Sequence, residues 1–192
     1  MKVKSDDVER IESHLHEAGQ VILSTVGLSA QIAEVAQALN TSLKAGGTIF
    51  WCGNGGSAAD SQHLSAELIG RYKHERKAIS SIALTTDTSV ITAISNDFGF
   101  EFVFSRQLEG LARPGDVLIA LTTSGDSKSV INAVDKAQEL GVTSVILTST
   151  RYSGNNGDFV LKVASEKTEL IQHAHTAIGH ILCELIESSS LA

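Results

Sequence analysis

The feature that most limits the fold of this chain is an alternation of short apolar runs with helical segments, which begins after Gly47. Five runs rich in β-branched and apolar residues are predicted strands, at 48–52, 79–84, 117–121, 142–148 and 159–163. Helical patterns fill the gaps, near 57–72, 89–94, 101–112, 127–140 and 170–187. Strands that alternate with helices form right-handed crossovers, and continuously apolar strands are typical of a sheet covered on both faces. The sequence therefore predicts a three-layer α/β fold with a mostly parallel, five-stranded sheet.

The residues before this alternation predict a pair of helices. In the first helix, apolar residues recur at three- and four-residue steps, at Val8, Ile11, Leu15, Ala18 and Ile22. In the second, Ser29 is a candidate N-cap, Gly46 and Gly47 end the helix, and the apolar stripe consists of Ile32, Val35, Ala36, Leu39 and Leu43. The apolar surface of two long helices is larger than one small sheet needs to cover it. Part of this surface is therefore predicted to form a subunit interface.

Length and composition indicate one domain spanning residues 1–192, with the helical pair at 1–46 and the α/β core at 47–192. A chain of 192 residues has the length of a single ordinary domain, and no Pro- or Ser-rich linker divides it. Its 15 basic and 22 acidic residues give a net charge of −7, which argues against nucleic acid or an anionic membrane as partner. A small anionic ligand remains compatible, because backbone amides bind phosphate without basic side chains.

The cysteines and the N-terminus point to a cytoplasmic protein. Cys52 and Cys183 both lie in apolar contexts, so they are expected to be reduced core residues in a reducing compartment. The first residues are charged and carry no signal-peptide hydrophobic region. The uninterrupted apolar runs are too short to cross a bilayer.

Two loops that follow predicted strands have the composition of ligand-binding loops, because ligands of open parallel sheets bind outside the carboxyl ends of the strands. The first reads Cys-Gly-Asn-Gly-Gly-Ser at 52–57, where glycines allow a tight turn and Ser57 could cap the next helix. It lacks the spacing of a dinucleotide-binding loop, and a simple sharp turn is the alternative.

The second loop carries five hydroxyl side chains around Gly125 at the start of a helix: Thr122, Thr123, Ser124, Ser127 and Ser129. Phosphate is bound by hydroxyl donors, free amides and the positive end of a helix dipole. Helix capping is the alternative, but five hydroxyls exceed what capping requires, so phosphate binding is favoured. A third polar segment, Ser-Asn-Asp-Phe-Gly at 95–99, is a weaker signal.

Histidines on two predicted helices are candidates for a metal or acid/base site. His63 and Glu67 are four residues apart, so they share a helix face. The C-terminal helix is otherwise apolar but carries Gln172, His173, His175 and His180. Imidazoles on a buried helix need polar partners, which a metal or a catalytic site can supply. The spacing matches no familiar zinc motif, and a structural role for each pair remains open.

Taken in order, several motifs resemble those of the phosphoheptose isomerases, which isomerise sedoheptulose 7-phosphate and have the sugar-isomerase (SIS), flavodoxin-like fold. These are the 52–57 loop, Gln62-His63, Glu67-Leu68, Gly70-Arg71-Tyr72, Asn-Asp-Phe-Gly-Phe at 96–100, Gly-Asp-Val-Leu at 115–118, Thr-Ser-Gly-Asp-Ser at 123–127, Ile171-Gln172, His175 and His180. The resemblance covers nearly the whole chain. It is specific, since many sugar-isomerase domains share the loops but lack His63, Glu67, Gln172 and His180 together.

The resemblance implies an isomerase that makes D-glycero-D-manno-heptose 7-phosphate through an enediol, for lipopolysaccharide heptose synthesis. Glu67 would be the base and His180 the acid partner. One zinc per subunit would be held by His63, Glu67, Gln172 and His180, in a homotetramer. The substrate-binding positions that it implies are Asn54, Gly55, Gly56, Ser57, Glu67, Asn96, Asp97, Thr122, Thr123, Ser124, Ser127 and Gln172.

Some features depart from this pattern. Segment 150–158 is shorter than the usual loop, and Leu170 and His173 replace a basic and an acidic residue. Gln172 and His180 are eight residues apart, about 12 Å along a helix, so they must lean together or come from different chains. The alternative function is a non-enzymatic tetrameric scaffold that binds the replication initiator protein. Such scaffolds lack a carboxylate at the position of Glu67, although Ala58, Ala59 and Gln62 are similar to theirs.

Overall fold

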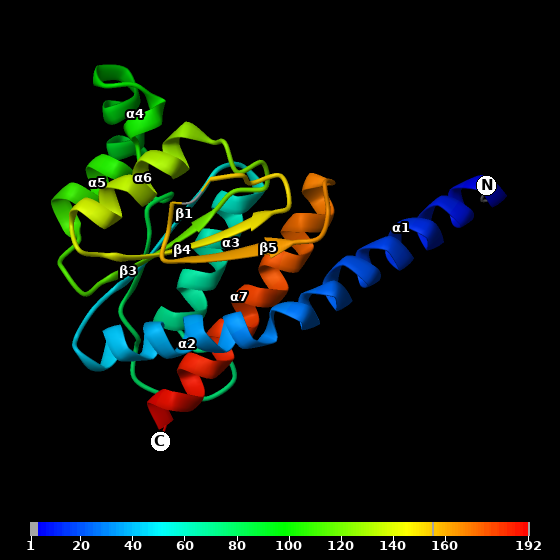
Figure 1. Ribbon diagram of the computed structural model, residues 1–192, viewed down its shortest axis with the longest axis horizontal. Coiled ribbons are helices and arrows are strands. Elements are labelled where there is room, and N and C mark those ends of the chain that lie inside the picture. The colour runs from blue at the N-terminus through cyan, green and yellow to red at the C-terminus, as the bar shows by residue number, and fades with distance from the viewer. Residues whose placement is uncertain (1–3, 155, 192) are drawn as a thin grey trace.

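The computed structural model describes residues 4–154 and 156–191 and has the predicted three-layer α/β architecture (Figure 1). In the described residues the sheet has five strands in the order β2-β1-β3-β4-β5, and every neighbouring pair is parallel. The strands are β1 (Ile49–Gly53), β2 (Ser81–Ala83), β3 (Val117–Leu121), β4 (Thr143–Ser149) and β5 (Phe159–Val163). The predicted fold class is thus confirmed, with strand bounds shifted by at most a few residues.

Helices cover both faces of this sheet, so the central strands are buried on both sides. On one face lie α2 (Ser29–Lys44), α3 (Gly56–Ile69) and α7 (Thr168–Leu191) (Figure 1). On the other lie α5 (Ser105–Leu111) and α6 (Lys128–Glu139), with α4 (Thr88–Asp97) at the periphery. Alternate residues of one strand supply the two cores, as Trp51 faces the first and Phe50 the second.

The two N-terminal helices differ in what they bury. The apolar stripe of α2 packs into the core, where Ile32, Val35 and Leu39 are buried. Helix α1 (Ser5–Ser24) extends away from the body (Figure 1), and most of its stripe is exposed, with Leu15 at 65%. The stripe of α2 therefore serves the fold of one chain, whereas that of α1 is left uncovered.

Two local predictions for these elements need correction. Ser29 does not cap α2, because a 3-10 turn (Thr25–Leu28) runs directly into the helix and leaves no free N-terminus; its hydroxyl donates to Val26 O at 2.7 Å. The predicted helix 101–112 is divided into a 3-10 turn (Phe100–Phe102) and α5. Val103 and Phe104, between the two, are both buried. The helix end near Gly46 is confirmed, with a φ of 87° at that residue.

Both cysteines are buried and free, as predicted. Burial raises the pKa of the Cys183 thiol to about 12 and that of Cys52 still further, so both remain protonated and unreactive.

One helical stretch, Ser5–Lys44, contains an 18-residue window with mean hydropathy 1.3, enough by length and composition to cross a membrane. The uninterrupted apolar runs of the sequence are too short to span a bilayer, whereas this window also includes polar residues. Within this stretch α2 supplies core residues such as Val35 and Leu39, whereas 28% of the window itself is buried.

Candidate active site

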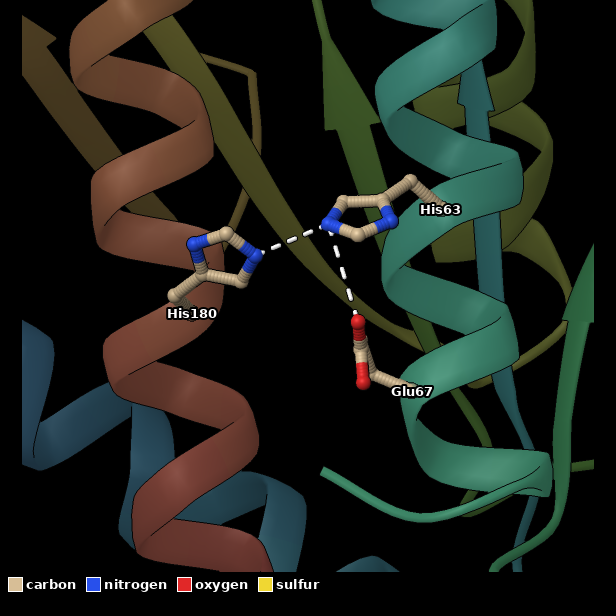
Figure 2. Close-up of side chains that lie close together, drawn as sticks. All are labelled: His63, Glu67 and His180. Carbon is tan, nitrogen blue, oxygen red and sulfur yellow. Dashed lines mark hydrogen bonds and ion pairs between the residues drawn. The ribbon is translucent and has the colours of Figure 1, made fainter. Parts of the chain in front are cut away.

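Helices α3 and α7 bring three of the predicted residues together, although His63 and His180 are 117 positions apart in the chain (Figure 2). His63 Nε2 lies 2.8 Å from His180 Nε2 and 3.7 Å from Glu67 Oε1. The two helices approach closely because residue 179 is glycine: a Cβ there would lie 2.3 Å from a methyl group of Leu64. Close packing of the helices thus places His180 opposite His63.

The three side chains, called the triad below, have the donor types and spacing of a metal site. One ligand atom from each lies within 4.8 Å of the others. Two imidazole nitrogens bound to one tetrahedral zinc at 2.0–2.1 Å would lie about 3.3 Å apart, so a small movement of the rings admits the ion. Two histidines and a glutamate with one open position form a ligand set found in catalytic zinc sites. The triad therefore fits zinc.

The two predicted loops meet at the carboxyl ends of β1 and β3 and enclose a cavity of about 370 Å³. It is lined by Asn54, Gly55, Gly56, Ser57, Leu121, Thr122, Thr123, Ser124, Ser127, Thr168 and Gln172. The loops are tied by the Asn54 amide, which donates to Ser127 Oγ at 2.8 Å and to Ser129 Oγ at 2.9 Å. Most of the predicted binding residues are thus collected around one cavity, and Thr168 is an addition that the sequence did not indicate.

Two of the three glycines in the 52–57 loop, Gly55 and Gly56, are explained by the structure. Gly55 has a φ of 57°, which a side chain rarely tolerates, and it forms the N-cap of α3. A Cβ at Gly56 would lie 2.6 Å from the Gln172 amide, so glycine is needed for that approach. Ser57 does not cap the helix as predicted, because α3 already begins at Gly56 and Ser57 lies inside it.

Gln172 lies at the cavity, against Gly56. From Gly56 to His63 is seven residues of α3, about 10 Å along the helix axis. The described chain therefore places Gln172 beside the glycine loop. His63 lies about two turns further along α3, where it meets His180 of α7, and Glu67 lies one turn beyond His63. The zinc-binding role of Gln172 stays a prediction.

Asn96 and Asp97 lie apart from the cavity, at the C-terminal end of α4. Both are exposed, and the Asn96 amide donates to Asp97 Oδ1 at 2.7 Å. They are not among the residues that line the 370 Å³ cavity, so their predicted contact with the sugar is not formed by the cavity of a single chain.

The other histidines of α7 lie outside the triad. His175 is fully buried and its Nε2 lies 3.1 Å from Thr148 O, at the end of β4. Burial lowers its pKa to about 4 despite that carbonyl, so the ring is neutral. His173 is exposed and packs edge-on against His14 of α1, and Leu170 is a core residue.

Comparisons with known proteins identify the family of this chain. The model of the SIS domain family matches residues 14–149. The phosphoheptose isomerase of Aquifex aeolicus is 47% identical over 188 residues, which cover 94% of this chain and 96% of that protein. The chain belongs to the phosphoheptose isomerase family. The enzyme of that name from Akkermansia muciniphila is 51% identical over 83% of this chain and 86% of its own length.

Solved structures lead to the same family. A phosphoheptose isomerase from Neisseria gonorrhoeae superposes with a TM-score of 0.87 at 38% identity, over 94% of this chain and 98% of that one. A phosphoheptose isomerase from Francisella tularensis gives a TM-score of 0.90 at 33% identity, over 95% and 98% of the two chains. The family resemblance and the SIS fold predicted from the sequence motifs are thereby confirmed.

Proposed function

We propose that this protein is a phosphoheptose isomerase, which converts sedoheptulose 7-phosphate into D-glycero-D-manno-heptose 7-phosphate for lipopolysaccharide heptose synthesis. Membership of the phosphoheptose isomerase family supports the reaction. The observation that carries the assignment for this chain is the triad of His63, Glu67 and His180, which retains the carboxylate that the reaction requires. A chain of a water-soluble enzyme family with two buried, reduced cysteines fits a cytoplasmic location.

The phosphate end of the substrate is assigned to the cavity. Thr122, Thr123, Ser124 and Ser127 are the candidate hydroxyl donors, and the first turn of α6 follows them directly. Helix-terminal amides and hydroxyls together bind a phosphate without a basic side chain. The Gln172 amide and the exposed backbone at Gly55 and Gly56 suit the hydroxyl groups of the sugar chain.

The reacting end is assigned to the triad. Glu67 would take the proton from the carbon next to the carbonyl, and His180 would return a proton on the oxygen side, which an enediol route requires. Zinc held by His63, Glu67 and His180 would supply Lewis-acid stabilisation of the negative charge on the oxygens. Half-exposure of the His63 side chain, at 46%, leaves the triad open to a substrate.

A homotetramer is the proposed assembly. Four apolar residues of α1 and the turn after it have exposed fractions above one half: Ile11 at 58%, Leu15 at 65%, Leu23 at 69% and Val26 at 68%. A surface of this kind is typical of a subunit interface. A second copy could also complete the site, since Gln172, Asn96 and Asp97 lie away from the triad in one chain.

Substitution of this stripe tests the assembly. Leu15→Glu places a charge on the stripe without touching the core, so the protomer should remain folded, with a change in unfolding free energy within about 0.5 kcal/mol. Light scattering after gel filtration should show a smaller assembly, whereas the matched variant Gln20→Glu on the same helix should not. A tetramer that survives Leu15→Glu would reject this interface.

Isomerisation of sedoheptulose 7-phosphate is the direct test of function. Purified protein with added zinc should yield the aldose heptose phosphate, as detected by NMR, and Glu67→Gln should not. A wild-type protein that forms no aldose product with or without zinc would reject the isomerase. Capture of the replication initiator protein by such an inactive chain would favour the scaffold alternative instead.

A further inference from the structure

A buried carboxylate outside the triad anchors the loop that follows α3. Glu187, on α7, is 1% exposed. Its oxygens accept hydrogen bonds from three consecutive backbone amides, those of Tyr72 at 3.0 Å, Lys73 at 2.8 Å and His74 at 3.0 Å. One carboxylate thus fixes the backbone of residues 72–74 to the last helix.

Arg76 completes this anchor from the other side. Its Nε lies 3.2 Å from Glu187 Oε1 as an ion pair, and its side chain is 3% exposed. Its terminal nitrogens donate to the carbonyl groups of Glu67 and Leu68, both at 2.8 Å, at the C-terminal end of α3. A cation at this end of a helix also interacts favourably with the helix dipole. Arg76 therefore joins the helical turn that carries Glu67 to the residue that holds Tyr72.

The anchored loop reaches the triad through Tyr72. The Tyr72 ring stacks on the ring of His180, with centroids 5.5 Å apart and planes inclined by 21°. The His63 ring lies edge-on to the same imidazole at 5.0 Å. His180 is thus held between two rings, and only one of them belongs to the triad.

We propose that Glu187 and Arg76 are positioning residues for the triad, and that they act through Tyr72, whose ring fixes the orientation of His180. Partners that orient a metal-binding histidine normally bond its second ring nitrogen. Here a stacked phenol ring takes that place, and its own position depends on a buried ion pair two helical turns beyond His180. The inference rests on the proposed metal-binding role of the triad.

Zinc affinity, measured by competition with a chromophoric chelator, tests this directly. Loss of an outer partner of a metal ligand typically weakens metal binding by about 10- to 100-fold, and we expect a loss of this size for Glu187→Gln and Tyr72→Ala. Tyr72→Phe keeps the ring and should restore near-wild-type affinity. Glu184→Gln is the matched control, because Glu184 lies one turn away on α7 in an exposed ion pair with Lys73.

A second readout separates positioning from general loss of folding. Binding of inorganic phosphate to the metal-free protein depends on the loops at the strand ends and should be unchanged in Tyr72→Ala and Glu187→Gln. If Glu187→Gln loses phosphate binding together with zinc, it is misfolded, and Tyr72→Ala alone decides. Wild-type zinc affinity in Tyr72→Ala would overturn the proposal.

The same measurements distinguish this inference from the proposed function. A wild-type protein that binds zinc but leaves sedoheptulose 7-phosphate unchanged would contradict the isomerase, while the order of zinc affinities would still decide the role of Tyr72. A wild-type protein that turns over the sugar but binds no zinc would contradict the positioning role and keep the isomerase.

Discussion

The cavity at the strand ends and the triad on α3 and α7 are built in different ways. The cavity is formed by two loops that begin at buried strands, and side-chain bonds such as Asn54 to Ser127 lock the loops together. The triad stands on the surfaces of two helices, with Glu67 22% and His63 46% exposed, and its geometry depends on helix packing at Gly179. The binding end is therefore preformed by the sheet, whereas the reacting end depends on helix packing and on the loop after α3.

This difference explains how the work of an isomerase could be divided. Phosphate recognition needs hydrogen-bond donors in fixed positions and involves no proton transfer. Hydroxyls and backbone amides at strand ends meet this need. Proton transfer and charge stabilisation need titratable groups that a substrate can reach, and the side chains of His63 and Glu67 are 46% and 22% exposed. Substitutions in the two regions should accordingly have different kinetic signatures.

The largest effect is expected for Glu67→Gln. Loss of a general base lowers kcat by about 10²- to 10⁴-fold, and the isosteric amide should leave KM nearly unchanged. If Glu67→Gln loses turnover while elemental analysis shows that it retains zinc, Glu67 acts primarily as the base. Turnover within a few per cent of wild type would remove Glu67 from the chemistry.

His180→Ala should weaken zinc binding and lower turnover with it, because it removes one of three candidate ligands. We expect a loss of zinc affinity above the roughly 10- to 100-fold that outer partners contribute. His173→Ala, an exposed histidine of the same helix, is the matched control. If His180→Ala retains zinc and His173→Ala loses it, the metal ligand on α7 is His173 and not His180.

The two loops can be predicted from residue patterns alone, whereas the triad is predicted only through the family resemblance. Glycines and hydroxyls at strand ends act locally, so the hydroxyls around Gly125 can be assigned to phosphate from the strand pattern, whereas the role of Asn54 comes from the family resemblance. His63 and His180 are far apart in sequence, and only the family resemblance joined them. Tyr72 belongs to the Gly-Arg-Tyr motif at 70–72, but no local pattern indicates its contact with His180. Nor does any local pattern indicate that the carboxylate of Glu187 on α7 accepts hydrogen bonds from three backbone amides of a distant loop.

His175, between the two regions on α7, should make stability depend on pH. Burial lowers its pKa to about 4, from 6.5 in an unfolded chain. Between these values the unfolded chain binds more protons, so the free energy of unfolding decreases as the pH falls from 6.5 towards 4, by about 3 kcal/mol at most. Urea unfolding at several pH values should show a smaller decrease for His175→Phe. An identical decrease in both proteins would contradict a buried, neutral His175.

Ser124→Ala should produce the smallest change, confined to substrate binding. A hydrogen bond to a charged group contributes about 1.5–3 kcal/mol, which corresponds to roughly a 10- to 100-fold increase in KM. The value of kcat and the melting temperature should change little. Steady-state kinetics of this variant beside Thr92→Ala, on the exposed face of α4, would show whether the effect is specific. An unchanged KM in single alanine variants of Thr122, Thr123, Ser124 and Ser127 would reject the phosphate site.

Titration of the metal-free protein with inorganic phosphate most directly tests whether the two regions are separate. Calorimetry would compare wild type, Ser124→Ala and Glu67→Gln under identical conditions. If the cavity binds phosphate independently of the triad, Ser124→Ala weakens phosphate binding by about 10-fold or more, while Glu67→Gln binds phosphate as wild type does. Loss of phosphate affinity in Glu67→Gln with full affinity in Ser124→Ala would contradict it.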